Sequence, residues 1–274
     1  MRYSFNLVYR LLTGYRMSIK KGDQTLQRKE VLVKERGSIT EAIIHQGVNK
    51  INNYAFQDCS RLNSVTIPNS VTEVGQHAFN GCKSLTSITI PDSVTSIAEA
   101  AFWGCSSLTS ITIPEGVYKI EDRAFENCTN LTTINIPDIS VIRHNVFRGC
   151  KRLTSITIPD SVTTIGDGAF QNCTDLTYIT IPNSVTEIGD SAFQGCSRLT
   201  SISIPDSVTA IGPCAFKDCS SLNHLIIPDS LNNQDPTHWA HKGIDLNKTQ
   251  LMTHSQLSEW AKEYNLEGHY SIDE

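Results

Sequence analysis

The chain has no long hydrophobic run. None of its segments approaches the roughly 18 consecutive apolar residues that a transmembrane helix needs. The apolar start from Met1 to Leu12 is interrupted by Arg10 and lacks an Ala-x-Ala-like cleavage site, so it does not have the features of a signal peptide. We therefore predict no membrane span and a cytoplasmic location.

Clustered positive charge is also missing. The formal net charge is −5, and no basic stripe runs along the chain. A nucleic-acid-binding surface needs clustered lysine and arginine side chains to neutralise phosphates. The sequence therefore predicts no nucleic-acid partner.

Motifs for catalysis, cofactors and metals are missing as well. There is no G-x-x-x-x-G-K-[ST] or G-x-G-x-x-G phosphate loop, and no His and Asp pair recurs beside the serines, as a nucleophilic serine would require. His238 and His241 lie three residues apart without a Cys or Glu at metal-ligand spacing nearby, so we interpret them as part of a cap turn. The sequence predicts a protein that is not an enzyme and has neither a cofactor nor a metal.

What the chain does have is a unit of about 23 residues that occurs eight times, A-F-x-x-C-x-x-L-x-x-I-x-I-P-x-x-V-x-x-I. Successive units are 23 residues apart except for one step of 22. The phenylalanines are Phe56, Phe79, Phe102, Phe125, Phe147, Phe170, Phe193 and Phe216, and the cysteines that follow them are Cys59, Cys82, Cys105, Cys128, Cys150, Cys173, Cys196 and Cys219. A fixed period of this size predicts a solenoid, in which each unit buries its apolar face by stacking on its neighbours.

One unit shows what each coil contains. Leu85 to Pro91 alternates apolar and polar residues, with Ile88 and Ile90 on one side, as in a strand with one buried face. A second short alternating piece follows, and Ala-Phe-x-x-Cys then makes about one helical turn. Equivalent strands of successive coils must lie parallel, about 4.8 Å apart.

The repeat predicts a single domain with two caps. The N-terminal cap spans 1–38, with an extra strand at Val31–Val33; the solenoid spans 39–231 in about eight to nine coils; the C-terminal cap spans 232–274. Thr253 and Gln256 form a capping box, so we expect a helix at about 253–264. Atypical end segments of this kind cover the open faces of a stacked array.

The eight framework cysteines occupy the same position in every unit. They are therefore expected to form a ladder of buried, reduced thiols that behave as small hydrophobic groups. Parallel side chains in uniform rungs give no signal for disulfide pairing. Cys214 lies at a variable position, where we expect it to be exposed, and the abundance of thiols favours a reducing compartment.

The motifs L-x-x-I-x-I-P, V-x-x-I-G and A-F-x-x-C closely resemble those of the BspA-like leucine-rich repeat family, from about Ile39 to Leu231. The resemblance implies a repeat solenoid, mainly β, of the α/β leucine-rich repeat type. It further implies a curved right-handed coil with a parallel concave sheet of L-x-x-I-x-I strands and short helical turns at the corners. Members are surface, secreted or effector proteins, so the resemblance implies a binding role. It also raises a host cytosol, reached by a specialised secretion system, as a second location.

A binding site on a repetitive scaffold is expected where one copy departs from its siblings at exposed positions. On the concave sheet, the usual Ser or Thr is replaced by Asn135, Tyr178, His224 and Ile226. Tyr178 is the strongest candidate, because an amphipathic aromatic ring offers contact area and a hydrogen bond. His224 and Ile226 belong to the final coil, where coverage by the C-terminal cap is the alternative.

A second group of departures, on the outer face, lies between Ala98 and Arg148. Its candidate partner-binding residues are Trp103, Tyr118, Lys119, Arg123, Arg143, His144 and Arg148. The 22-residue unit falls in the same region, where Pro137 to Ile142 has lost one residue, and we expect a tighter corner and altered stacking there. An exposed tryptophan amid mixed charge favours an interaction patch.

These patterns together predict a protein–protein interaction scaffold, monomeric and non-enzymatic, with a protein as its partner. The alternative is a cell-surface adhesin that binds glycan or matrix through the Ser- and Thr-lined concave sheet. Ice binding is a third hypothesis, because regular threonine ladders suit it, but the expected curvature of the sheet opposes a match to flat ice.

Overall fold

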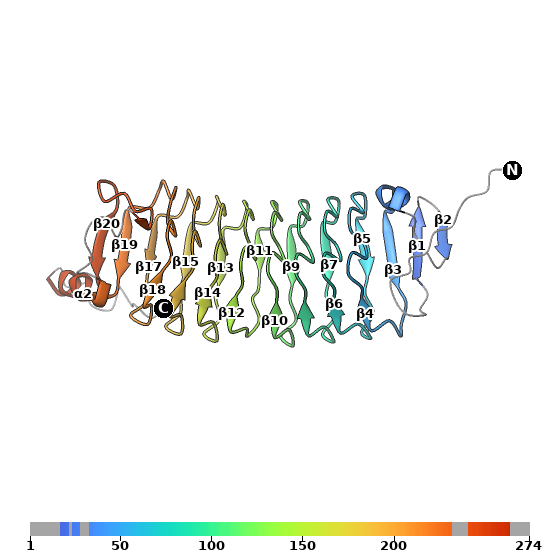
Figure 1. Cartoon of the computed structure of the whole chain (residues 1–274), viewed down its shortest axis with the longest axis horizontal. Coiled ribbons are helices and arrows are strands. Elements are labelled where there is room, and N and C mark those ends of the chain that lie inside the picture. The colour runs from blue at the N-terminus through green and yellow to red at the C-terminus, as the bar shows by residue number, and fades with distance from the viewer. Residues whose placement is uncertain (1–16, 22–23, 28–32, 232–240, 264–274) are drawn as a thin grey trace.

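The protein is a stack of coils. The computed structural model describes residues 17–21, 24–27, 33–231 and 241–263. Within them, about nine coils follow one another along an axis that is nearly straight in the view of Figure 1. The parallel-strand solenoid predicted from the repeat is confirmed.

Each coil contributes its L-x-x-I-x-I strand to a first sheet, the one that the sequence assigns to the concave side, and the hydrogen bonding of this sheet is interrupted at three places. These strands are β3 (Glu41–Ile44), β5 (Ser64–Thr66), β7 (Ser87–Thr89), β9 (Ser110–Thr112), β11 (Thr133–Ile134), β13 (Ser155–Thr157), β15 (Tyr178–Thr180), β17 (Ser201–Ser203) and β19 (His224–Ile227). The caps extend this sheet with β1 (Met17–Lys21) and β2 (Gln24–Gln27) at one end and β20 (Gln250–Thr253) at the other.

The V-x-x-I segment of each coil forms a second sheet, several of whose strands are labelled in the lower half of the ribbon in Figure 1. Its strands are β4 (Lys50–Ile51), β6 (Glu73–Val74), β8 (Ser96–Ile97), β10 (Lys119–Ile120), β12 (Val141–Ile142), β14 (Thr164–Ile165), β16 (Glu187–Ile188) and β18 (Ala210–Ile211). Strands of neighbouring coils are parallel, and each residue pairs with its equivalent, as Ser87 does with Ser110. Every framework position therefore forms a column along the solenoid.

Alternation fixes which side of each short strand is buried. In β7, Ile88 is buried while Ser87 and Thr89 are exposed, and β-branched residues suit this half-buried surface. Proline then ends the strand, and the Val94 N–H donates to the Pro91 carbonyl at 2.9 Å to close a β-turn. The turn starts the second strand of the same coil.

The centre of every coil is occupied by its phenylalanine. All eight rings are fully buried and stack in one column, with neighbouring centroids 5.2 to 5.9 Å apart and interplanar angles of 2° to 17°. These spacings correspond to offset stacking, the arrangement that aromatic quadrupoles favour. The phenylalanine column ties each coil to the next in the core.

The cysteines line the same interior. The Cys82 thiol donates to the Phe56 carbonyl of the preceding coil at 3.2 Å, and this bond recurs along the column as far as Cys219. All nine cysteines are free, so the predicted ladder of reduced thiols is confirmed, although Cys219 is partly exposed. Cys214, which was expected to be exposed, is half-buried.

The corners need left-handed backbone at the residue before each ladder cysteine. The residues in this column, with φ between 59° and 75°, are Asp58, Gly81, Gly104, Asn127, Gly149, Asn172, Gly195 and Asp218. Gly, Asn and Asp tolerate this conformation better than other residues. A Cβ on Gly149 or Gly195 would also meet the side-chain oxygen of the asparagine in the preceding coil, so asparagine and glycine pack as complementary neighbours.

The 22-residue coil has a tighter corner than the others. There the Ile139 N–H donates to the Pro137 carbonyl at 2.7 Å, a three-residue turn, where other coils use a four-residue β-turn. The second sheet is interrupted at the same place, because one ladder runs from β4 to β10 and the next from β12 to β18. The tighter corner and altered stacking predicted from the missing residue are confirmed.

The N-terminal cap differs from its prediction. Val33 begins a 3-10 helix (Val33–Ser38) instead of ending a strand, and residues 28–32 lie outside the described part of the chain, as do 1–16. The strand that covers the first coil is β1, which pairs antiparallel with β3. An antiparallel strand does not follow the parallel pairing of the repeat, so the 23-residue period contains no signal for it.

The C-terminal cap contains the predicted helix as α2 (His254–Glu263), after a short 3-10 helix at Asp229–Leu231. The Gln256 N–H donates to Thr253 Oγ1 at 3.1 Å, and the Thr253 N–H donates to Gln256 Oε1 at 2.8 Å, so the capping box is confirmed. Residues 232–240, with His238, and 264–274 lie outside the described residues. No described helix has the length and apolar character needed to span a membrane.

The buried thiols predict a loss of stability at high pH. Burial raises the pKa of Cys173 from 9.0 to about 12, so the folded thiol stays neutral at a pH where the unfolded one ionises. Its contribution to the free energy of unfolding is complete below about pH 9 and is lost as the pH rises toward about 12, at about 1 kcal/mol per pH unit. We expect the urea midpoint of the chain to fall between about pH 8 and pH 10.

Cys173→Ala is the matched control, because it removes one buried thiol from the titration. Its urea midpoint should fall less than that of the parent over the same pH interval. An equal fall in both proteins would show that other groups govern the alkaline transition.

Candidate functional site

Tyr178 lies on the exposed face of the first sheet. In β15 it takes the position that serine holds in neighbouring strands, and its side chain is 54% exposed. The Thr180 hydroxyl donates to the Tyr178 hydroxyl oxygen at 2.9 Å. Residues two apart on one strand face lie about 7 Å from each other, so this bond lays the tyrosine along the strand. The exposed aromatic ring expected from the sequence is present, and its partner-binding role stays a prediction.

Asn135 has a structural partner in the preceding coil. Its Nδ2 donates to the Ile113 carbonyl at 2.7 Å, and its Oδ1 accepts the Ile113 N–H at 2.8 Å. In another coil the equivalent N–H, that of Ile204, donates to the backbone carbonyl of Ile226. The Asn135 side chain therefore replaces a ladder bond beside the shortened coil.

The other two predicted residues of the first sheet lie where the C-terminal cap begins. His224 is exposed and Ile226 is half-buried in β19. Strand β20 pairs with β19, and α2 packs against both. The cap therefore extends over the last coil and partly covers Ile226, whereas His224 stays exposed.

One histidine fastens this cap to the sheet. His254 is 9% exposed, with Nδ1 2.9 Å from Asp206 Oδ1 and Nε2 3.4 Å from Ser203 Oγ. The three side chains follow the order of a Ser-His-Asp triad, but the Asp206 side chain is 73% exposed, and Ser203 lies within the paired strand β17. We therefore assign the cluster to anchoring the cap.

On the outer face, Tyr118 is the most exposed aromatic residue, at 67%. It lies in a column of threonines whose hydroxyls donate to a carbonyl of the preceding coil, namely Thr72, Thr95, Thr163, Thr186 and Thr209. Tyr118 interrupts this hydroxyl row and presents its ring to solvent.

Trp103 is 40% exposed and follows Phe102 at the cysteine corner. Its two neighbours in the same column, Asn80 and Glu126, are only 4% and 6% exposed. Equivalent side chains stack about 5 Å apart, so the large indole shields the side chains on either side of it. The exposed part of the ring is available to a partner.

The charged residues of the outer face form two clusters. Lys119 and Arg143 both bind Glu121, with Arg143 Nε 3.2 Å from Glu121 Oε2. Arg123 and Arg148 both bind the buried Glu126, at 3.7 and 3.2 Å. Two cations therefore share one carboxylate in each cluster.

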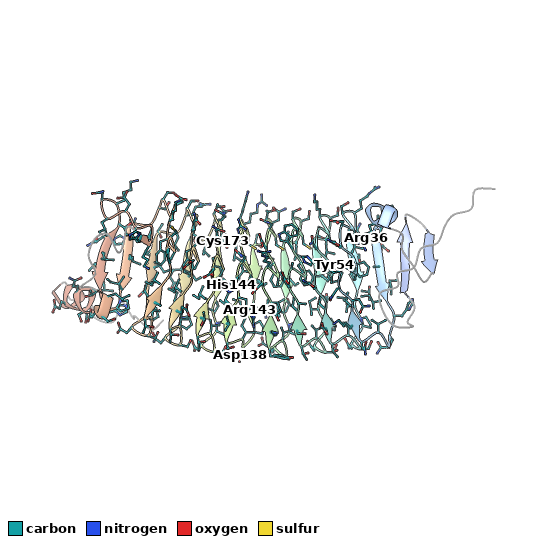
Figure 2. The ribbon with its side chains drawn as sticks, viewed as in Figure 1. Arg36, Tyr54, Asp138, Arg143, His144 and Cys173 are labelled. Carbon is teal, nitrogen blue, oxygen red and sulfur yellow. The ribbon has the colours of Figure 1, made fainter. Side chains whose placement is uncertain are left out.

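His144 belongs to neither cluster. Its Nδ1 accepts the Asp167 N–H at 3.1 Å, which joins two successive coils at one corner. In Figure 2, Arg143 and His144 both lie on the middle coils of the stack. An open hollow of about 410 Å³ adjoins this region, lined by Lys50, Asn53, Glu73, Gln76, Ala98, Glu99, Glu121 and Asp122. Among the described residues, no group of His, Cys, Asp and Glu is arranged to hold a metal.

The regular coils match a known repeat. The model for the BspA type leucine rich repeat region, with six copies, matches residues 33–154 and 140–254. The chain belongs to the BspA type leucine-rich repeat family. The resemblance expected from the L-x-x-I-x-I-P and A-F-x-x-C motifs is thus confirmed.

Solved structures of other leucine-rich repeat proteins are similar to this BspA type chain. One from Bacteroides ovatus is 29% identical, with a TM-score of 0.64, covering 86% of this chain and 69% of that one. The T. pallidum leucine-rich repeat protein is 25% identical, with a TM-score of 0.50, covering 78% of this chain and 92% of that one. A comparison with curated proteins gave no significant match.

The burial of the thiols bears on the location of this BspA type chain. Desolvation raises the pKa of the ladder thiols, to about 12 at Cys59, Cys128 and Cys173. The thiolate is the form that oxidises and exchanges disulfides, so buried neutral thiols would also persist in an oxidising compartment. The cytoplasmic location therefore stays a prediction, to which the cysteine count adds no support.

The dual hydrogen bond of Asn135 gives a prediction about stability in this BspA type coil. Asn135→Thr, which restores the residue of the column, should lower the free energy of unfolding by about 1–3 kcal/mol, because the Ile113 backbone loses both partners. Urea unfolding measures the change. Thr157→Ala in the same column is the control, and equal stability of the two variants would contradict a structural role for Asn135.

Proposed function

We propose that this chain is a non-enzymatic protein-binding module whose partner docks on the outer face. That face comprises Trp103, Tyr118, Lys119, Arg123, Arg143, His144 and Arg148. The observation that carries the proposal is Tyr118, a tyrosine 67% exposed at a position where five other coils have a threonine bonded to the preceding coil.

The composition of the two faces favours the outer one for a protein partner. Binding hot spots are enriched in Trp, Tyr and Arg, while Ser and Thr are under-represented. The outer face combines Trp103 and Tyr118 with three arginines, whereas serine and threonine dominate the exposed face of the first sheet. Tyr178 is the exception on that face.

The ion-pair clusters hold cationic side chains in fixed positions on this surface, where they can make polar contacts. Glu121 is shared by Lys119 and Arg143, and Glu126 by Arg123 and Arg148. An arginine has five N–H donors, so a guanidinium held by one carboxylate keeps donors for a second one. Acidic side chains on the partner are therefore the expected complement at the rim around Tyr118.

The scaffold lowers the cost of binding because its surface is already ordered. Strands β8 and β10 pair in register, and the backbone on both sides of Tyr118 is bonded to the preceding coil. Association loses less conformational entropy when the bound geometry exists beforehand. A rigid array can hold the aromatic and charged residues of one site in fixed positions across neighbouring coils.

Affinity capture with single substitutions tests this proposal. The immobilised full chain should retain a protein that purified Tyr118→Ala and Trp103→Ala variants bind at least about tenfold more weakly, as loss of a hot-spot side chain predicts. Titration calorimetry with the identified, purified partner measures the change in affinity.

Tyr178→Ala is the matched control, because it removes a comparably exposed tyrosine from the other sheet. The proposal predicts that its affinity for the partner equals that of the parent. If Tyr178→Ala bound the partner more weakly while Tyr118→Ala bound it as the parent does, the protein site would lie on the first sheet, and the proposal would be wrong.

A further inference from the structure

The exposed face of the first sheet carries no charge over six consecutive coils. We call it the hydroxyl face, and it consists of Ser64, Thr66, Ser87, Thr89, Ser110, Thr112, Thr133, Ser155, Thr157, Tyr178 and Thr180, together with the structurally bonded Asn135. The residues of this face are exposed in each of the strands β5, β7, β9, β11, β13 and β15. It is a different surface from the outer face.

The hydroxyls of this face differ from those elsewhere in the coils. The threonines of the Thr95 column and of the Thr109 column donate to carbonyls of the preceding coil, and serines such as Ser93 and Ser184 do the same. The hydroxyls of Ser87, Thr89, Ser110, Thr112, Ser155 and Thr157, by contrast, have no hydrogen-bond partner among the described residues. The chain therefore uses its other hydroxyl rows internally and leaves this array available to a ligand.

Tyr178 gives the array an aromatic platform. The hydrogen bond from Thr180 holds its hydroxyl at 2.9 Å and keeps the side chain extended along the strand. The ring is 54% exposed, so one side of it can contact a flat, apolar ligand surface. The C–H face of a pyranose ring has that shape, while its edge carries hydroxyls that pair with serine and threonine.

The turns along one edge of the hydroxyl face disfavour a polyanion. The turns that follow its strands carry an exposed acidic residue in four successive coils, namely Asp92, Glu115, Asp138 and Asp160. Figure 2 places Asp138 at the lower edge of the stack, at such a turn. Like charges repel within about 8–10 Å at moderate ionic strength, so a polyanion is disfavoured along this edge. The corners that precede the strands, by contrast, carry exposed basic residues such as Lys83, Lys151 and Arg152.

The cap already shows how a ring bonds to this sheet. Beyond the last coil of the hydroxyl face, His254 lies against β17 with Nε2 3.4 Å from the Ser203 hydroxyl. Ser203 belongs to the same column as Thr180 and Thr157. A polar ring laid on this column is therefore an arrangement that the folded chain itself adopts.

The repeat distance points to a polymer. Equivalent strands of successive coils lie about 4.8 Å apart, a spacing comparable to the length of one sugar residue in an extended β-1,4-linked chain. We propose that the hydroxyl face binds an extended, neutral β-linked polysaccharide that runs along the solenoid axis with one sugar over each coil. Tyr178 stacks on one sugar, and the unpartnered serine and threonine hydroxyls bond its neighbours.

Binding of the purified full chain to defined neutral glycans tests this inference. The probes are microcrystalline cellulose and chitin for retention, and cellohexaose and chitohexaose for titration calorimetry. The chain should bind at least one of the two glycan types, and both Tyr178→Ala and Ser155→Glu should weaken that binding by about tenfold or more. Unchanged unfolding midpoints would show that both variants remain folded.

Tyr118→Ala is the matched control, since it removes an exposed tyrosine from the outer face alone. It should leave glycan affinity unchanged. The protein-binding proposal can therefore fail without affecting the inference about glycan binding. The inference is overturned if the parent binds none of the probes, if Tyr178→Ala and Ser155→Glu bind as the parent does, or if heparin binds more tightly than the neutral glycans. Ice shaping without glycan binding would assign the face to ice and overturn it too.

Discussion

The structure depends on vertical register, by which every residue lies over its equivalent one coil away. Parallel ladders impose this register on the backbone, so each side chain must be able to stack on a copy of itself or on a complementary neighbour. Phenylalanine meets this demand by offset stacking, with rings up to 5.9 Å apart. Cysteine meets it with a thiol that bonds the preceding coil, as Cys105 does to Phe79. The core is uniform because few residues satisfy the constraint.

Departures from the repeat are tolerated where a side chain leaves its column. Tyr118 and Tyr178 replace hydroxyl residues at exposed positions without disturbing the strands beneath them. The missing residue of the 22-residue coil is more demanding, because it interrupts the second sheet between β10 and β12. Asn135 offsets part of that disturbance by bonding both backbone groups of Ile113. The two tyrosines therefore change only the surface, whereas Asn135 restores backbone hydrogen bonds next to the missing residue.

Sequence reasoning succeeded where information was local or periodic. The strands, the cysteine ladder and the capping box of Thr253 follow from spacing alone. The antiparallel β1 and the contact of His254 with Asp206 were missed, because no period links segments that meet only in the folded chain. The structural role of Asn135 was missed, because the sequence does not show that its side chain bonds the backbone N–H and carbonyl of Ile113. The signal for left-handed corners was present, however, in the Asp, Asn and Gly residues that precede the cysteines.

That column of corner residues has an implication for how such an array changes length. Asn127 lies beneath Gly149, and Asn172 beneath Gly195, with each amide oxygen occupying the space that a Cβ on the glycine would need. Loss of the single coil that carries Gly149 would set Asn172 on Asn127. Loss of two adjacent coils keeps the alternation. Between Asn127 and Gly195, therefore, a change in length preserves this packing only when coils are lost in pairs.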